Sequence, residues 1–263
     1  MNSNKNTKEF FYYPPFSRKP EWVPFSKRIR LRFNNETIAD SLRVMMKRGF
    51  PPWYFIPRYD INMELLDKNT EESDKDEWGN IVKWHLNSNG RTAKNAAWSY
   101  EKPFENAPLN VEKYMAFKWE AIDSWFEEDE EVFVHPYDPY HRIDMRKSSR
   151  RIRILLNDET VADSKNLVIL FETGLPARFY LPRSDVKMDL LIPVEHQTQC
   201  PYKGTASYFS VKTGETELEN AVWTYKNPIP EAQKIKNLLA FHTEKMENVF
   251  VDGVRLPENE MNL

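Results

Sequence analysis

The chain has 263 residues, which is enough for one large domain or for two domains of about 130 residues each. Hydrophobic residues make up 40% of the sequence and charged residues 29%, proportions that are typical of a soluble globular protein. The formal net charge of -3 argues against the clustered basic surface of a nucleic-acid-binding protein. A single cysteine, Cys200, excludes an intramolecular disulfide and a cysteine-rich zinc site.

No apolar run approaches the ~18 residues that a membrane helix requires, and the polar residues 1–8 do not resemble a secretory signal. We therefore expect a cytoplasmic protein with no membrane or nucleic-acid partner. No sequence motif predicts a cofactor or a metal site.

Two copies of one unit follow an N-terminal segment, residues 1–20, that we expect to be flexible. Residues 28–41 match residues 151–164 at nine of 14 positions. Later matches join 55–58 to 180–183 and 97–100 to 222–225, and the separation stays between 123 and 125 residues. Such regular self-similarity indicates a tandem duplication. We assign the first repeat to 21–133, an ordered linker rich in Pro, His and Tyr to 134–147, and the second repeat to 148–263.

The second repeat alternates short apolar or β-branched runs with turn residues, which predicts strands joined by turns. We expect strands at 151–156, 160–163, 167–171, 178–181, 206–211, 217–225 and 238–241, and a closing hairpin over 249–255. Short helical turns are expected at 185–191 and 230–236. The predicted fold class is mainly β with minor short helices, as two tandem copies of a small twisted-sheet, β-barrel-like or tent-like domain.

The most reactive residue types of the second repeat gather in residues 196–204. A nearby cation lowers the pKa of a cysteine thiol and makes it more nucleophilic, so Lys203 could activate Cys200. His196 is a candidate general base, and Tyr202 a candidate ligand contact. The alternatives are that Cys200 is a small buried apolar residue, Lys203 caps turn carbonyls and His196 is a surface residue.

Arg183 and Asp185 follow a proline at the end of a predicted strand, where binding residues often lie. Both have counterparts in the first repeat, Arg58 and Asp60, which favours a structural ion pair as the alternative. Trp223 and Tyr225 are candidate pocket-wall or core residues, and the linker residues His135 and His141 could close a pocket.

The second repeat resembles the family called domain of unknown function 427, which carries a nucleotidyltransferase label. The matching residues are 174–176, 180–183, 185–186, 190–191, the Cys-Pro-Tyr-Lys-Gly block 200–204, Ala206, Tyr208, Trp223 and Tyr225. The linker residues 138–142 also resemble the joint of two-copy members, whereas Phe209 stands where tryptophan is common. The resemblance implies a small β-rich fold and no established reaction. Glu172 and Tyr208 within the resembling stretch complete the candidate ligand-binding set.

The first repeat provides an internal comparison. At a constant separation of 125 residues, Cys200 corresponds to Lys75 and Lys203 to Trp78, and only Gly79 is kept opposite Gly204. This loss predicts that the block is functional and that the first repeat is degenerate.

Our leading hypothesis is therefore a small-molecule pocket in the second repeat, for an anionic or carbonyl-containing ligand, with catalysis through Cys200 and Lys203 as an extension. The alternatives are a cysteine-nucleophile enzyme, a nucleotidyltransferase and a non-catalytic interaction module.

Overall fold

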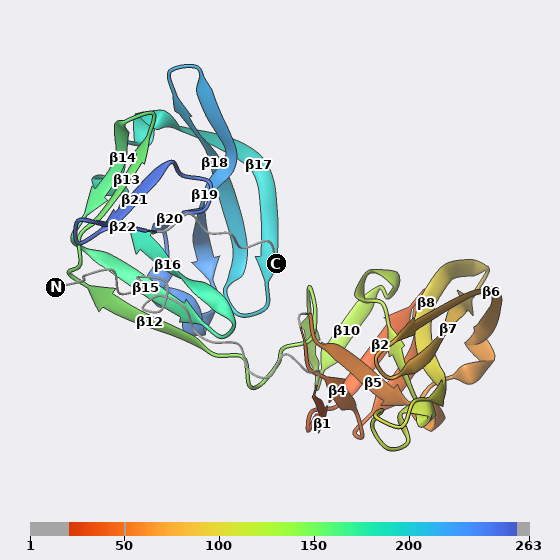
Figure 1. Ribbon diagram of the computed structural model, residues 1–263. Coiled ribbons are helices and arrows are strands. Elements are labelled where there is room, and N and C mark those ends of the chain that lie inside the picture. The colour runs from red at the N-terminus through yellow and green to blue at the C-terminus, as the bar shows by residue number, and fades with distance from the viewer. Residues whose placement is uncertain (1–20, 50, 257–263) are drawn as a thin grey trace. The chain divides into compact units, whose positions relative to one another are not determined.

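The computed structural model describes residues 21–49 and 51–256, and the expected flexible segment 1–20 lies outside the described residues. These residues form two compact units, and the chain passes from the first to the second between Asp138 and Pro139 (Figure 1). Each unit contains one copy of the repeat, so we call them the first and the second domain. Strands dominate both domains, and the helices described are all short 3₁₀ turns, as the predicted fold class requires.

The first domain contains a seven-stranded antiparallel sheet of order β1-β4-β5-β9-β8-β7-β6 and a four-stranded sheet of order β11-β10-β2-β3. Its elements are β1 (Trp22–Pro24), β2 (Ile29–Phe33), β3 (Glu36–Ser41), β4 (Met45–Lys47), β5 (Trp53–Pro57), η2 (Arg58–Asp60), η3 (Met63–Leu65), β6 (Leu66–Asp76), β7 (Gly79–Ser88), β8 (Arg91–Pro103), η4 (Val111–Lys113), β9 (Tyr114–Phe117), η5 (Trp119–Ala121), β10 (Ser124–Glu127) and β11 (Glu130–Val132).

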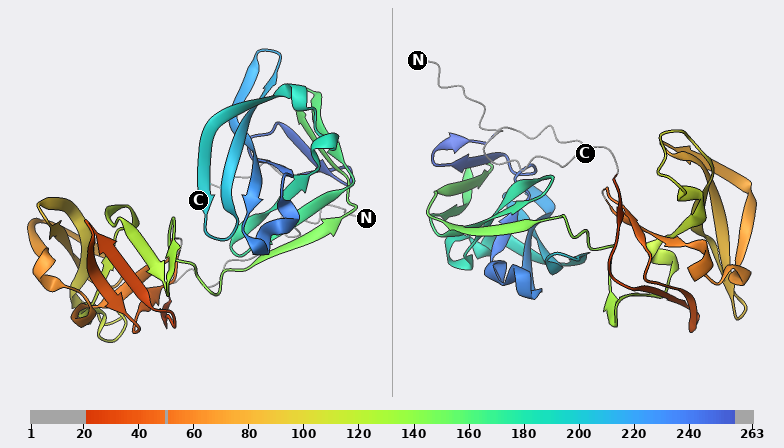
Figure 2. Two further views of the ribbon diagram at one scale, coloured as in Figure 1. Left: turned by 180° about the vertical axis from the view of Figure 1, so that it is seen from behind. Right: turned by 90° about the horizontal axis from the view of Figure 1, so that it is seen from below.

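The second domain repeats this topology with sheets of order β12-β15-β16-β20-β19-β18-β17 and β14-β13-β21-β22. Its elements are β12 (Ile143–Ser148), β13 (Ile152–Leu156), β14 (Glu159–Ser164), β15 (Leu167–Glu172), β16 (Leu175–Leu181), η6 (Arg183–Asp185), η7 (Met188–Leu190), β17 (Leu191–Cys200), β18 (Gly204–Thr213), β19 (Thr216–Pro228), η8 (Pro230–Ile235), β20 (Leu239–Phe241), β21 (Asn248–Val251) and β22 (Val254–Arg255). The seven-stranded sheet curls strongly, which Figure 2 shows in two further views.

Two strands of the second domain differ from the expectations. Strand β12 begins inside the expected linker, and β17 covers a stretch for which no strand was expected over 192–200. Both are edge strands of the seven-stranded sheet, and most side chains of β17 are exposed. An edge strand with little burial carries a weak hydrophobic alternation, so its pairing with β18 is visible only in the structure.

Each seven-stranded sheet has apolar side chains on both faces, because alternate residues of a strand point to opposite sides. In the second domain Ile169 and Val222 belong to the main core against the four-stranded sheet, whereas Leu170 and Trp223 belong to a smaller cluster. We call this second cluster the small core. The first domain has an equivalent small core around Phe55. The candidate site lies at the small core of the second domain.

No helix among the described residues is long and apolar enough to span a membrane.

Candidate functional site

The Cys-Pro-Tyr-Lys-Gly block is the hairpin turn between β17 and β18. Cys200 ends β17 and pairs with Gly204, which begins β18. The turn of the first domain is one residue shorter, and there Asp76 pairs with Gly79. Strand register therefore makes Cys200 the counterpart of Asp76. The constant separation used in the sequence comparison matched Cys200 to Lys75, and the extra residue in the second turn corrects that match.

The glycine shared by both turns has a steric cause. Gly204 has a φ of +101°, a backbone conformation that side chains disfavour. A Cβ at this position would lie 3.3 Å from the Asn227 carbonyl oxygen, and one on Gly79 would lie 2.9 Å from the Cα of Pro103. The glycine is therefore a structural requirement of both hairpins, whereas the residues before it are free to differ.

A buried ion pair joins this turn to β15. The Lys203 Nζ donates to Glu172 Oε1 and Oε2 at 2.6 and 2.5 Å, and both side chains are at most 10% exposed. The linker residue His141 places its Nε2 3.0 Å from Glu172 Oε1. The His141 ring stacks on Tyr202 with a centroid separation of 4.2 Å. Four of the residues proposed from the sequence thus form one contiguous cluster.

The carboxyl group of Glu172 is ionised in this cluster. Burial alone raises its pKa, but the hydrogen bond with His141 and the charge of Lys203 outweigh burial and lower the pKa to about 2. The positive charge of Lys203 is consequently neutralised by its own protein partner. A buried pair of this kind is held firmly, because removing one member would leave the other charged and unpaired.

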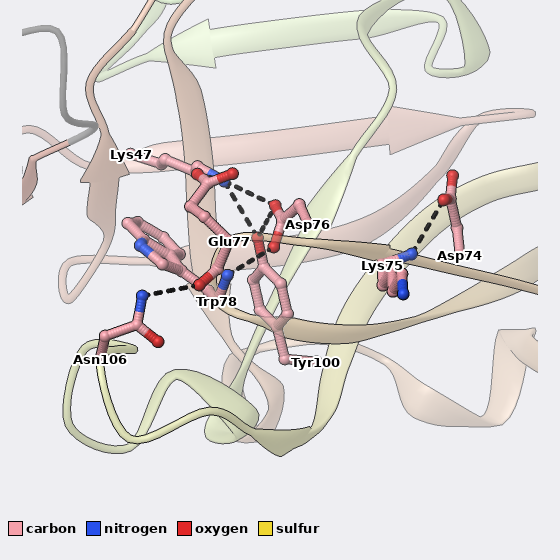
Figure 3. A network of polar contacts seen from close by, with 8 residues as sticks. All are labelled: Lys47, Asp74, Lys75, Asp76, Glu77, Trp78, Tyr100 and Asn106. Carbon is pink, nitrogen blue, oxygen red and sulfur yellow. Dashed lines mark hydrogen bonds and ion pairs between the residues drawn. The ribbon is translucent and has the colours of Figure 1, made fainter.

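The first domain contains the corresponding ion pair with its charges exchanged between the two elements (Figure 3). There the cation, Lys47, comes from β4, the counterpart of β15, and its Nζ lies 2.8 Å from Asp76 Oδ2 and 2.9 Å from Glu77 Oε1. The same Nζ lies 4.1 Å from the ring centroid of Trp78, the counterpart of Lys203. In both domains an ion pair therefore joins the turn to the equivalent strand. The strand carries the cation in the first domain and the anion in the second.

Two equivalent tyrosines of β8 and β19 differ in their hydrogen bonds. The Tyr100 hydroxyl donates to Asp76 Oδ2 at 2.7 Å and accepts from Lys47 Nζ at 3.1 Å. Tyr225 is 5% exposed, yet its hydroxyl makes no hydrogen bond with any described residue. Burial raises the pKa of both tyrosines, so both hydroxyls stay protonated.

The small core of the second domain has lost much of the aromatic packing found in the first. Four aromatic positions of the first domain carry non-aromatic side chains at the equivalent register positions of the second. The pairs are Trp22 and Met145, Trp53 and Arg178, Trp78 and Lys203, and Tyr114 and Leu238. In the first domain these rings pack edge to face, for instance Trp22 against Trp78 at 5.6 Å. The second domain keeps Tyr180 and Trp223 here, whose Nε1 and hydroxyl oxygen lie 3.2 Å apart.

The structure brings most of the candidate residues to this side of the sheet. Tyr208 packs against the small core with Trp223, and its hydroxyl lies 2.9 Å from Thr198 Oγ1. Cys200 is partly exposed, and its ionisation would act on both Tyr180 and Tyr225. The thiol therefore lies within electrostatic range of two buried hydroxyls.

His196 is placed apart from Cys200. It lies four residues earlier on the extended strand β17, and a rise of about 3.3 Å per residue separates the two Cα atoms by about 13 Å. The His196 ring instead packs beside Tyr208 with a centroid separation of 4.8 Å. The geometry gives no support to His196 as the base for Cys200.

Arg183 and Asp185 lie toward the main core. The Arg183 guanidinium lies 5.6 Å from the ring of Phe209, a main-core residue, and Asp185 Oδ2 accepts from Ser164 Oγ at 2.6 Å. The first domain repeats the second contact between Ser41 and Asp60, also at 2.6 Å. The recurrence indicates a structural role for Asp185, but none of the ion pairs of the described residues joins it to Arg183, the pairing raised from the sequence.

Sequence reasoning treated Tyr225 only as a core or wall residue and did not single out Tyr180. A signal for Tyr180 existed, because it replaces Phe55 in an otherwise matching segment. No such signal existed for Tyr225, since the same residue type occupies both repeats. Tyr225 differs from Tyr100 only in its surroundings, because the hydrogen-bond partners of Tyr100 come from β4 and from the turn.

A depression lies on the first domain, away from the cluster around Lys203. It has a volume of about 640 Å³ and is lined by Asp74, Lys75, Asn80, Ile81, Val82, Glu101 and Lys102. Its charged groups carry both signs and its lining includes none of the residues that match the Cys-Pro-Tyr-Lys-Gly block. Within residues 21–49 and 51–256 no group of three or more His, Cys, Asp or Glu side chains is arranged to hold a metal ion.

Comparison with known proteins agrees with the duplication. A family described as domain of unknown function (DUF427), whose short name refers to nucleotidyl transfer, matches residues 21–128 and again residues 144–252. The chain belongs to this family. Each match covers one of the two structural domains, so this member carries the family domain twice. A comparison with curated proteins found no match.

Proposed function

We propose that the second domain binds a small, uncharged, carbonyl-containing molecule beside the turn that carries Cys200 and Lys203. The observation that carries the proposal is the unpaired hydroxyl of Tyr225 in a small core that has exchanged aromatic rings for smaller or polar groups. Ligand pockets are typically apolar with a few convergent polar groups, and this composition fits. The first domain fills the equivalent space with its own tryptophans and hydrogen bonds.

The charges around Tyr225 favour a carbonyl over an anionic ligand. Lys203 is paired with Glu172, and the pair is neutral as a whole. Among the ionisable groups that act on Tyr225, Glu172 is negatively charged, whereas the hydroxyl of Tyr180 stays protonated. A buried anion beside Tyr225 would have to pair with Lys203, which already has Glu172 as its partner.

Alkylation of Cys200 tests the proposal directly. Because Cys200 is the sole thiol, its reaction with iodoacetamide reports on this site alone. We expect small amides, ketones or aldehydes to slow the reaction in a saturable manner, and propionate at the same concentration to leave it unchanged. A carbonyl pocket at this turn would be rejected if the alkylation rate of Cys200 were the same with and without each carbonyl compound. An iodoacetamide reaction with a small exposed thiol peptide controls for direct reaction with the reagents.

A cysteine-nucleophile enzyme is the second candidate, favoured by the register position of Cys200. Its counterpart Asp76 points at Tyr100, so Cys200 is directed toward Tyr225 and toward any ligand held there. The thiolate is the reactive form of cysteine. The rate of alkylation between pH 5 and 10 yields the thiol pKa. A pKa clearly below ~8 that rises in Lys203→Ala favours catalysis, whereas an ordinary pKa favours binding alone.

The remaining alternatives have less support. Nucleotidyl transfer requires groups that hold a triphosphate, and the cation of this cluster, Lys203, is already paired with Glu172. A pure interaction module predicts that no small molecule changes the alkylation of Cys200, so the same experiment separates it from the pocket.

A further inference from the structure

We infer that Tyr225 and Tyr180 form a two-donor site for one carbonyl oxygen of the ligand. This inference rests on the proposed function and names the residues that determine its specificity. The two tyrosines belong to the same small core, on neighbouring parts of β19 and β16 with β20 between them. The sequence suggested only a core or pocket-wall role for Tyr225 and none for Tyr180.

Both hydroxyl groups carry a proton without an acceptor. Tyr225 makes no hydrogen bond through its hydroxyl with the described residues, and Tyr180 only accepts one, from Trp223 Nε1 at 3.2 Å. Tyr180 is 1% exposed, and burial raises its pKa as well. Buried polar groups are nearly always hydrogen-bonded, so two unused donors in one core call for an acceptor from outside the chain.

The Tyr225 hydroxyl is not sealed from solvent. Among the described residues, the side-chain atoms that are both fully enclosed and unpaired are the Nε atoms of Arg30 and Arg58. The hydroxyl of Tyr225 does not belong to that group, so it keeps some solvent-accessible surface. At the turn, Cys200 stands at the register position of Asp76, whose carboxylate accepts from Tyr100.

The first domain shows what is missing. Tyr100 has the Asp76 carboxylate as its acceptor, and Phe55 at the Tyr180 position needs none. The Phe55 and Tyr100 rings, which occupy the positions of Tyr180 and Tyr225, are stacked with centroids 6.1 Å apart. In the second domain Cys200 and Leu170 stand at the register positions of Asp76 and Lys47, and neither side chain supplies a strong acceptor.

A carbonyl oxygen matches this arrangement. It has two lone pairs in one plane and can accept from both hydroxyls, whereas an ammonium group has no lone pair and would leave the tyrosine protons unpaired. The same acceptor is present in an amide, a ketone or an aldehyde, whereas a carboxylate would need a cation and Lys203 already has Glu172 as its partner.

The test compares propionamide, propionate and propylamine as probes in ¹H–¹⁵N NMR titrations of the full chain. We expect propionamide to shift resonances of the second domain, and Tyr225→Phe to weaken its binding roughly five- to tenfold, the usual value of one hydrogen bond. The matched variant Tyr100→Phe should leave binding unchanged. Tyr180→Phe should weaken it also, but it removes the acceptor of Trp223 Nε1, so Tyr225→Phe is the deciding variant.

Each outcome has one meaning. Propionamide binding to the second domain that is equal in wild type and Tyr225→Phe would overturn the two-donor site and leave the proposed pocket standing. Preferred binding of propionate or propylamine would overturn the carbonyl class. Shifts confined to the first domain, or none with any probe, would overturn the proposed function together with this inference. The dispersion of the amide spectrum of each variant verifies that it is folded.

Discussion

Tyr225 occupies in the second domain the position that Tyr100 occupies in the first, and the two hydroxyls have opposite hydrogen-bonding states. Tyr100 is held by Asp76 and Lys47, whereas Tyr225 has no partner among the described residues. The duplication thus keeps the tyrosine and changes only what surrounds it. This difference can be measured on the protein without any ligand.

Removing the two hydroxyls should affect stability differently. Tyr100→Phe deletes a buried hydrogen bond and leaves the Asp76 carboxylate with one donor fewer, so we expect a loss of about 1–3 kcal/mol in the unfolding free energy of the first domain. Tyr225→Phe removes an unpaired buried hydroxyl and should change that of the second domain by less than about 0.5 kcal/mol. Native-state hydrogen exchange with peptide resolution measures each domain separately. Similar losses in both variants would mean that Tyr225 has a partner.

The Lys203–Glu172 pair should behave as a coupled unit. Replacing Lys203 with Met leaves a buried carboxylate unpaired and should cost about 3–5 kcal/mol, and Glu172→Gln should cost a similar amount. The double variant should recover much of this loss, because neither buried charge remains. A double-mutant cycle, read from the exchange of second-domain amides, yields the coupling energy. Strictly additive losses would contradict the pairing.

The ionisation of Glu172 should make the second domain sensitive to acid. The pKa of Glu172 is about 2 in the folded protein, below its ordinary value of 4.5, so the unfolded state binds the proton more readily. The contribution of ionised Glu172 to the unfolding free energy is fully present above about pH 4.5 and is lost as the pH falls from there toward about 2. Urea unfolding at a series of pH values should show this loss in wild type. The Glu172→Gln, Lys203→Met double variant should have a flatter profile over that window.

His141 should control access to the turn. Its ring covers Tyr202 and its Nε2 contacts Glu172, so His141→Ala should loosen residues 201–203 and raise the alkylation rate of Cys200 severalfold. His85→Ala is the control, since it removes a histidine of the first domain, whose Nδ1 accepts from the Asn95 backbone N–H. Equal rates in wild type and both variants would show that His141 does not shield the thiol.

The duplication, the β class and most strands of the second domain follow from the sequence itself. Nine identities in one 14-residue segment and regular alternation over 152–156 are local patterns, and local patterns survive without knowledge of the fold. The edge strand β17 was missed for a physical reason. Its side chains are mostly exposed and it is stabilised by pairing with β18, which no local pattern records.

The sequence also identified the turn at 200–204 and, with it, Glu172, Tyr202 and His141 as candidates. Tertiary structure decided how they act. The ion pair joins Lys203 to Glu172, 31 positions earlier in the chain. Because this pair neutralises the charge of Lys203, the lysine is not a free cation that could bind an anion. Likewise the role of Asp185 depended on its contact with Ser164, and that of His196 on its distance from Cys200 along β17 and its contact with Tyr208. Sequence spacing did not predict that Cys200 takes the position of Asp76, the partner of Tyr100, because one additional residue in the second turn shifts the match. Contacts between strands distant in sequence fix which polar groups are satisfied, and an unsatisfied hydroxyl such as that of Tyr225 is therefore a property of the folded chain alone.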